Sequence, residues 1–147
     1  MIAIACDHAA LDLKNEIINH LQKKGLTCKD FGTNDKNSCD YSDFAYPAAK
    51  SVAKGECNLG ILICGTGIGM SITANKIKGI RCALCGDCFS AQATRNHNDA
   101  NMLALGARVT GVGLALKIVD AFIEGVFEGG RHQRRIDKIA EIEKKEG

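Results

Sequence analysis

The sequence of 147 residues contains no tryptophan, and only 5% of its residues are aromatic. It therefore lacks the set of exposed rings on which single-stranded nucleic acid stacks. Neither sign of charge dominates, because 19 Lys and Arg oppose 17 Asp and Glu, which leaves a formal net charge of +2. A balance this even gives no electrostatic signature of nucleic-acid binding. These absences argue against RNA or DNA as a partner.

Long apolar runs are also absent, since no segment approaches the roughly 18 residues that a membrane-spanning helix needs. The first six residues, MIAIAC, reach Asp7 without a basic stretch before them, which is not the pattern of a secretion signal. We therefore expect a cytoplasmic protein with no membrane partner. With 46% apolar residues in a chain of ordinary domain length, one domain is expected over residues 1–147.

Cysteine, in contrast, is abundant, with eight residues. Disulfides, a metal or cluster site, or free thiols with one reactive member would each explain this number. Without a secretion signal, disulfides are the least favoured explanation. Cys82, Cys85 and Cys88 have the spacing that begins an iron–sulfur run, but Gln92 stands where the fourth cysteine belongs. Cys82 and Cys85 also fall in an apolar strand pattern, where they would face opposite sides, so we expect no cluster.

Short apolar runs alternate with amphipathic stretches along the chain. This alternation predicts a Rossmann-like three-layer αβα sandwich, in which helices cover both faces of a five-stranded parallel sheet. The expected strands are residues 2–6, 26–31, 59–64, 80–85 and 102–105. The expected helices are residues 9–24, 44–54, 70–76, 89–95, 112–127 and 131–145. Pro47, the single proline, is placed in the first turn of its helix, where proline is best tolerated.

Ligands of such sheets bind beyond the carboxyl ends of the strands. Asp7 and His8 directly follow the first expected strand. Cys64 with the Gly65–Gly69 loop follows the third, and the Gly86–Asp87 pair follows the fourth. We therefore expect these residues to line one edge of the sheet.

The segment from Cys64 to Gly69, CGTGIG, is the strongest local signal. Its glycines let the backbone approach a ligand closely, and its entry into a helix presents free N–H groups to an anion. The spacing differs from that of dinucleotide-binding and P-loop motifs, and Met70 stands where a phosphatase loop needs arginine. The segment is either an anion cradle with a thiol at its edge or a tight turn with a buried cysteine. A thiolate in the first setting serves as nucleophile or general base.

Two polar clusters further along the chain are candidates to complete a site. His97 is flanked by asparagines, and with Asn98 it could partner Cys64 in papain-like acyl transfer. Arg131 and Arg135 are four residues apart, which places them on one face of a helix. Two guanidinium groups side by side suit a phosphate. Ordinary solvated surface remains the alternative interpretation of both clusters.

Together these motifs resemble ribose-5-phosphate isomerase type B, in the family that also contains the galactose-6-phosphate isomerase subunits. The resemblance runs essentially from end to end. It rests on Cys6–His8, Asp40–Tyr41, Ile63–Gly69, Ala74–Lys76, Ser90–Gln92, Asn96–Asp99 and Glu128–Arg135. It implies an aldose–ketose isomerase without cofactor or metal, which interconverts D-ribose 5-phosphate and D-ribulose 5-phosphate through an enediolate in the pentose phosphate pathway. It also implies a homodimer or dimer of dimers, with a shared active site and a C-terminal helix that extends to the partner.

The resemblance gives each motif a role. Cys64 is implied as the base that moves a proton between C1 and C2, Thr66 as the hydroxyl that assists transfer between the oxygens, and His97 as the residue that helps to open the ring. The enediolate would be held by the backbone N–H groups of Gly65, Gly67, Ile68 and Gly69. The sugar would be surrounded by Asp7, Tyr41 and Asn98. The phosphate would be bound by His8, Arg108, Arg131 and Arg135.

One departure and three alternatives stay open. Ser42 follows Tyr41 where many family members carry proline. Another branch of the family uses a carboxylate base and lacks the loop cysteine, so Cys64 argues against the galactose-6-phosphate subunits. The alternatives are an isomerase of a six-carbon sugar phosphate such as allose 6-phosphate, a thiol hydrolase that uses Cys64 and His97, and a sensor that binds a sugar phosphate without turnover.

Overall fold

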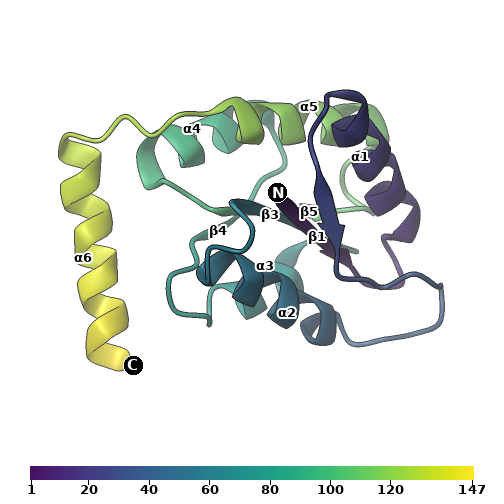
Figure 1. The fold of residues 1–147 in the computed structure, drawn as a ribbon, viewed down its shortest axis with the longest axis horizontal. Coiled ribbons are helices and arrows are strands. Elements are labelled where there is room, and N and C mark those ends of the chain that lie inside the picture. Colours follow the sequence, from purple (N-terminus) through teal and green to yellow (C-terminus); the bar gives the residue numbers. More distant parts are fainter.

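The computed structural model describes residues 1–147 and is built on one five-stranded sheet. All strands are parallel, in the order β2-β1-β3-β5-β4 (Figure 1). The strands are β1 (Ile2–Cys6), β2 (Cys28–Asp30), β3 (Leu59–Cys64), β4 (Cys82–Leu84) and β5 (Met102–Gly106). Because the strands are parallel, their carboxyl ends share one edge of the sheet, here called the carboxyl edge. The opposite edge, where the strands begin, is called the amino edge.

Helices cover both faces of the sheet, which confirms the predicted αβα sandwich. They are α1 (Leu11–Lys23), α2 (Tyr41–Ala53), α3 (Ile68–Ala74), α4 (Cys88–Asn98), α5 (Val112–Glu124) and α6 (Arg131–Glu146). The apolar sides of α1, α4 and α5 pack on one face, and those of α2 and α3 pack on the other (Figure 1). β3 shows why: Ile61 and Ile63 belong to the first core, whereas Leu62 belongs to the second. Side chains alternate between the two faces of a strand, so a strand buried on both sides is apolar throughout.

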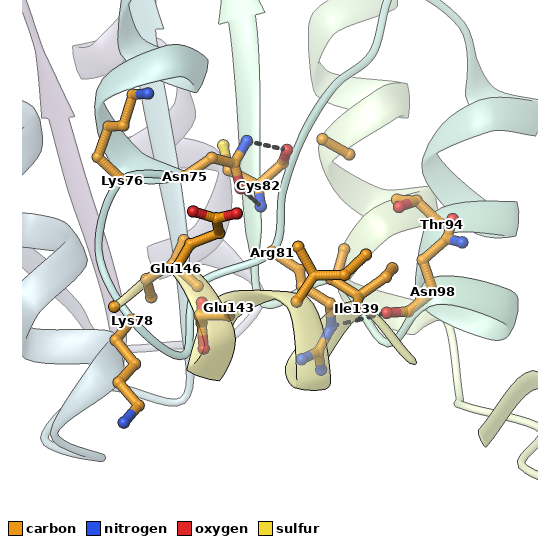
Figure 2. A pocket seen from close by; sticks show the side chains of 15 residues that line it. Asn75, Lys76, Lys78, Arg81, Cys82, Thr94, Asn98, Ile139, Glu143 and Glu146 are labelled. Atoms are coloured by element: carbon orange, nitrogen blue, oxygen red, sulfur yellow. Dashed lines mark hydrogen bonds between the residues drawn. The ribbon is translucent and has the colours of Figure 1, made fainter. Parts of the chain in front are cut away.

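The C-terminal helix α6 stands apart from the sandwich (Figure 1) and buries only Ile136. It contacts α4 near its start, and near its end Glu143 accepts the backbone N–H of Gly79 at 3.1 Å. A cavity of about 810 Å³ lies between α6 and the start of β4 (Figure 2). Ile139 and Ile142 of α6 line it, yet they remain 49% and 62% exposed. α6 therefore presents an apolar stripe that the chain itself does not cover.

The prediction for Pro47 is wrong. α2 begins at Tyr41 with Asp40 as its N-cap, so Pro47 lies inside the helix rather than in its first turn. The helix loses one backbone hydrogen bond there, since proline has no N–H. The packing of Ala45, Ala48 and Ala49 against the sheet compensates for this loss.

The predicted end of the fourth helix is also wrong, because α4 continues to Asn98 instead of stopping at Arg95. His97 and Asn98 are therefore in its last helical turn and not in a loop. Arg95 explains the extension. Its Nη1 donates to the carbonyl oxygen of Ala100 at 2.7 Å, which gives this backbone acceptor just beyond the helix a hydrogen-bond partner. The outer strands β2 and β4 are three residues each, shorter than predicted, since each pairs with only one neighbour.

All eight cysteines are free thiols. Cys82, Cys85 and Cys88 do not converge into a ligand group. Burial raises the pKa of Cys6 to about 12 and that of Cys85 to about 11, so both stay protonated at neutral pH. They act as small apolar core residues. No helix is both long and apolar enough to cross a lipid bilayer.

Candidate active site

Cys64 ends β3 at the carboxyl edge, and the loop after it turns directly into α3. The thiol is buried, and its Sγ accepts the backbone N–H of Gly67 at 3.1 Å. Gly67 has a φ of 81°, in the left-handed region that favours glycine. A Cβ at this position would also lie 2.8 Å from the carbonyl carbon of Leu105. The turn that brings an N–H to the sulfur therefore requires glycine.

The N–H groups of this loop divide into two kinds. Gly67 donates to Cys64, and Ile68 donates to Thr66 Oγ1 at 3.2 Å. The N–H groups of Gly65 and Gly69 have no partner in the protein. Of the four predicted anion-binding N–H groups, two are thus free for a ligand and two shape the loop.

Asp7 and His8 follow β1 at the same edge, as predicted. The backbone N–H of Asp7 donates to Ile63 O at 3.1 Å, which holds it beside the end of β3. Asp7 is buried, and its Oδ1 accepts the N–H of Ala9 at 3.0 Å. His8 Nδ1 accepts the backbone N–H of Cys39 at 3.2 Å. Neutral His8 therefore carries its proton on Nε2, from which it can donate to a ligand.

Tyr41 and Arg108 lie on either side of the loop. A Cβ on Gly69 would come within 2.5 Å of the Tyr41 ring, so this glycine allows the ring to pack directly on the backbone. Arg108 follows β5, donates its N–H to Gly65 O at 3.0 Å and runs its side chain past Gly65. Ser42 is the second residue of α2, a first-turn position that proline also tolerates.

A buried lysine, which the sequence reasoning missed, organises the neighbouring segment. Lys14 Nζ is fully buried and lies 2.9 Å from both carboxylate oxygens of Asp30. It also donates to Thr33 O and to Asn34 Oδ1. These bonds hold the segment after β2, and that segment supplies the Cys39 N–H to His8. The available signal was a charged residue on the apolar face of an otherwise amphipathic helix.

The remaining predicted residues lie elsewhere. Helix α4 runs back across the sheet, so His97 and Asn98 at its end lie at the amino edge, just before β5 begins. Arg81 Nε donates to Asn98 O at 2.9 Å there, beside the cavity under α6 (Figure 2). Arg131 and Arg135 are on the first turns of α6. One chain therefore does not bring Cys64 and His97 together.

The predicted site thus forms two separate groups. The Cys64 cluster, at the carboxyl edge, consists of Asp7, His8, Tyr41, Cys64–Gly69 and Arg108. The His97 cluster, at the amino edge and on α6, consists of His97, Asn98, Arg131 and Arg135. Each cluster offers different chemical groups. The first has the thiol and the free N–H groups, and the second adds an imidazole and two guanidinium groups.

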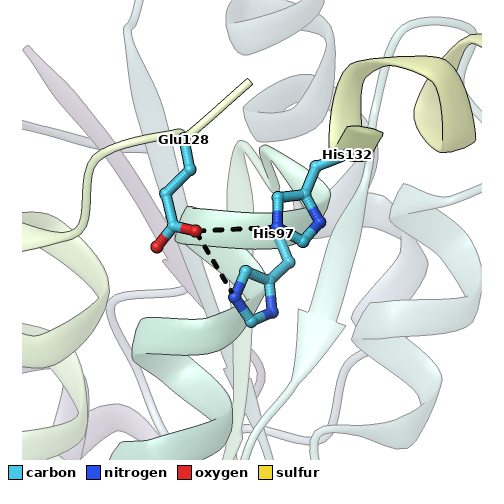
Figure 3. Close-up of side chains that lie close together, drawn as sticks. All are labelled: His97, Glu128 and His132. Atoms are coloured by element: carbon cyan, nitrogen blue, oxygen red, sulfur yellow. Dashed lines mark ion pairs between the residues drawn. The ribbon is translucent and has the colours of Figure 1, made fainter. Parts of the chain in front are cut away.

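His97 has two neighbours to which the sequence assigned no role (Figure 3). The rings of His97 and His132 are stacked, with centroids 4.3 Å apart and planes at 14°. Glu128 Oε1 lies 3.8 Å from Nε2 of His97 and 3.6 Å from Nε2 of His132. Asn96 holds the backbone of Glu128 beside the end of α4, because its carbonyl oxygen accepts the N–H of Glu128 at 3.0 Å.

Known proteins resemble this chain over its whole length. A family model described as Ribose/Galactose Isomerase matches residues 2–139. The ribose-5-phosphate isomerase B of Escherichia coli is 49% identical over 144 residues, which cover 98% of this chain and 97% of that protein. The D-erythrulose-4-phosphate isomerase of Pectobacterium atrosepticum is 47% identical over 146 residues, 99% of this chain and 96% of that protein. The structure of ribose-5-phosphate isomerase B from Clostridium thermocellum matches with a TM-score of 0.98 at 52% identity and 99% coverage of both chains. The chain therefore belongs to the ribose/galactose isomerase family, among its type B ribose-5-phosphate isomerases, and is an isomerase.

Proposed function

We propose that the protein interconverts D-ribose 5-phosphate and D-ribulose 5-phosphate through an enediolate, with Cys64 as the general base. Aldose–ketose isomerisation needs a base, a stabiliser of negative charge on oxygen and a proton shuttle. The observation that carries the proposal is the arrangement of the Cys64 loop. A thiol and two free backbone N–H groups, those of Gly65 and Gly69, lie on one short turn at the carboxyl edge.

In the proposed reaction, the Cys64 thiolate removes the proton from C2 of the open-chain aldose and returns it to C1. The free N–H groups of Gly65 and Gly69 stabilise the enediolate oxygens. Thr66 Oγ1 already accepts the Ile68 N–H, so its hydroxyl hydrogen remains available to a substrate oxygen. C2 is oxidised as C1 is reduced within the same molecule, so these steps require no external oxidant or reductant and no redox cofactor.

The phosphate is proposed to lie away from the reacting carbons, where its binding energy orients the sugar. His8 can donate from Nε2, and Arg108 extends beside Gly65 from the neighbouring strand. Arg131 and Arg135 would complete the phosphate site. Asp7, Tyr41 and Asn98 would contact the sugar hydroxyls, and His97 would assist ring opening.

Because one chain separates the Cys64 and His97 clusters, we propose a homodimer, alone or paired as a dimer of dimers, in which each site combines both clusters. The surface supports this assembly. Ile68, Ile72 and Val109 are 50%, 57% and 72% exposed around the Cys64 cluster. Helix α6, which carries Arg131 and Arg135, exposes its own apolar stripe and stands away from the body of the chain. Two such surfaces bury each other when α6 reaches across to a second copy.

We also propose a cytoplasmic location, consistent with eight cysteines that are all unpaired. A four-carbon sugar phosphate is a second candidate substrate, because the Pectobacterium relative at 47% identity is a D-erythrulose-4-phosphate isomerase. A six-carbon substrate such as allose 6-phosphate would need a longer pocket between the thiol and the phosphate site.

The proposal is tested by assaying the purified protein with ribose 5-phosphate, D-erythrulose 4-phosphate and allose 6-phosphate side by side. We expect the highest kcat/KM with ribose 5-phosphate, and deuterium from the solvent at the carbon that receives the proton. No turnover of any sugar phosphate, together with a covalent thioester trapped from an activated ester substrate, would favour a thiol hydrolase. Binding without exchange would indicate a sensor.

A further inference from the structure

We propose that His97, Glu128 and His132 form a binding site for a borderline divalent metal ion, of which Zn²⁺ is the best match. They are the one group of three His, Cys, Asp or Glu side chains whose ligand atoms converge, all within 4.8 Å of one another (Figure 3). The group comes from three parts of the chain: the end of α4, the segment after α5 and the first turn of α6.

The distances suit a shared ion better than they suit direct hydrogen bonds. Both Nε2 atoms face the same carboxylate oxygen, at 3.8 and 3.6 Å, which is beyond hydrogen-bond range. Two atoms bound to Zn²⁺ at about 2.0–2.2 Å in tetrahedral geometry are about 3.3–3.6 Å apart. The two imidazole rings are stacked with their planes at 14°, so both rings must turn out of this stack before their Nε2 lone pairs meet at one ion.

The chemistry of the three ligands selects the metal. Two imidazole nitrogens and one carboxylate oxygen are the ligand set of open zinc sites, which keep a fourth position for water or another ligand. Imidazole ligands suit Zn²⁺, Cu²⁺ and Ni²⁺, whereas Mg²⁺ and Ca²⁺ prefer sites built from oxygen. No thiol belongs to the group, although the chain has eight cysteines.

The backbone already holds the ligands in place. Asn96 accepts the N–H of Glu128 at its carbonyl oxygen and that of Val126 at Oδ1, at 3.0 and 3.1 Å. The N–H of His132 donates to Gly129 O at 3.1 Å at the start of α6. His132 is only 15% exposed, and its ring lies against that of His97. The backbone that carries the ligands therefore needs little further ordering when the ion binds, and the remaining change is rotation of the two rings out of their stack.

Two consequences follow from occupancy. The ion links α6 to α4. Without the ion, α6 has few contacts with the rest of the chain. The ion also takes the imidazole of His97 out of the proposed reaction, so Zn²⁺ becomes an inhibitor. The second consequence rests on the proposed function, whereas binding itself does not.

The test is titration of the purified metal-free protein with Zn²⁺ by calorimetry and equilibrium dialysis. We expect one ion per chain, and at least a tenfold weaker affinity in His132→Gln and in Glu128→Gln. His20→Gln is the matched control, because His20 pairs with Asp120 at 2.8 Å outside this group and its loss should leave affinity unchanged. Titration with Co²⁺ separates this site from the cysteines, since a nitrogen and oxygen ligand set lacks the intense near-ultraviolet band of cobalt–thiolate bonds.

Absence of binding, equal affinity in all three variants, or a cobalt–thiolate band would each overturn the site, whatever the isomerase assay shows. With ribose 5-phosphate, Zn²⁺ should inhibit the wild-type protein at least tenfold more strongly than His132→Gln. Equal inhibition of both would overturn the link between this site and turnover. An inactive protein that still binds one Zn²⁺ through these side chains would contradict the proposed function and leave the metal site intact.

Discussion

The backbone N–H of Gly67 donates to the thiol sulfur of Cys64 at 3.1 Å. Cys64 precedes Gly67 by three residues in the same loop. This bond holds the sulfur in one orientation while leaving it available as a proton acceptor. It depends on a left-handed backbone at Gly67 and on close contact with Leu105. The proposed base and the turn that orients it are thus one structural unit, and the first two predictions test them separately.

Replacement of the proposed base should stop catalysis without preventing binding. In Cys64→Ser, we expect the rate of ribulose 5-phosphate formation to fall about 10²–10⁴-fold, the range for loss of a positioned acid–base group. Binding of ribulose 5-phosphate, measured by calorimetry, should change little, because the phosphate contacts remain. Cys28→Ser on the outer strand β2 is the control and should stay active. Near-normal turnover in Cys64→Ser would exclude the base assignment.

Gly67→Ala should disrupt the turn. Its φ of 81° and a Cβ position 2.6–2.9 Å from Leu84 and Leu105 leave no room for a methyl group. We expect a loss of about 1–3 kcal/mol in the free energy of unfolding, measured with urea, together with loss of activity. Gly113→Ala on α5 is the matched control, because nothing lies within 4 Å of its Cβ position. That variant should be as stable as wild type or slightly more stable. A normal denaturation midpoint for Gly67→Ala would show that the loop adjusts.

Removal of the buried lysine should destabilise the fold. Lys14→Met removes the ion pair with Asp30, which is 31% exposed and keeps the Gly32 N–H as a donor, and it takes the ammonium away from the buried carbonyl of Thr33. We expect a loss of about 1–3 kcal/mol in the free energy of unfolding, the cost of leaving a buried acceptor without its donor. Lys36→Met removes an exposed pair with Asp12 at 3.4 Å and should cost less than about 1 kcal/mol. If the two variants lose equal stability, the buried network is not the cause.

The shared site predicts complementation between two inactive variants. Cys64→Ser and His97→Asn, denatured together and refolded, form mixed dimers in which one of the two sites has both side chains. We expect activity to recover to about a quarter of wild type with random assortment in a twofold dimer. A mixture of Cys64→Ser with Arg108→Ala should not recover, because both changes lie in the same cluster. Failure of the first mixture to recover, with mixed dimers present, would contradict a site shared between two chains.

The buried thiols predict a loss of stability at high pH. Burial raises the pKa of Cys6 from 9.0 to about 12, so above pH 9 this thiol ionises in the unfolded chain before it does so in the folded one. The unfolded state then binds fewer protons, and stability falls as pH rises. Between pH 9 and pH 10.5 this amounts to about 2 kcal/mol.

Urea unfolding of wild type and Cys6→Ala at both pH values isolates this contribution. The decline with pH should be smaller in the variant, whatever the cost of the substitution itself. Equal declines would mean that the folded protein exposes Cys6 to water.

The order of strands and helices followed from the sequence because each depends on local periodicity. β3 is apolar throughout, and the glycines after it mark the turn at the carboxyl edge. Local patterns gave wrong predictions where a contact with a residue outside the local pattern fixes the local structure. The hydrogen bond from Arg95 to the carbonyl oxygen of Ala100 supports the extension of α4 to Asn98. The packing of alanines on the sheet accommodates Pro47 within α2. Lys14 contradicted its helix pattern because its acceptors lie on a segment that begins 16 residues later.

The sequence by itself determined the family, the fold class and the nature of the candidate base, because motifs with specific spacing carry them. Only the tertiary structure decided that Cys64 and His97 lie at opposite edges of one sheet, since the direction of α4 across the sheet separates them. It also brought Glu128 and His132 to His97, from positions 31 and 35 residues further along the chain. Such convergence depends on how helices pack and on where α6 begins, and no local pattern records it.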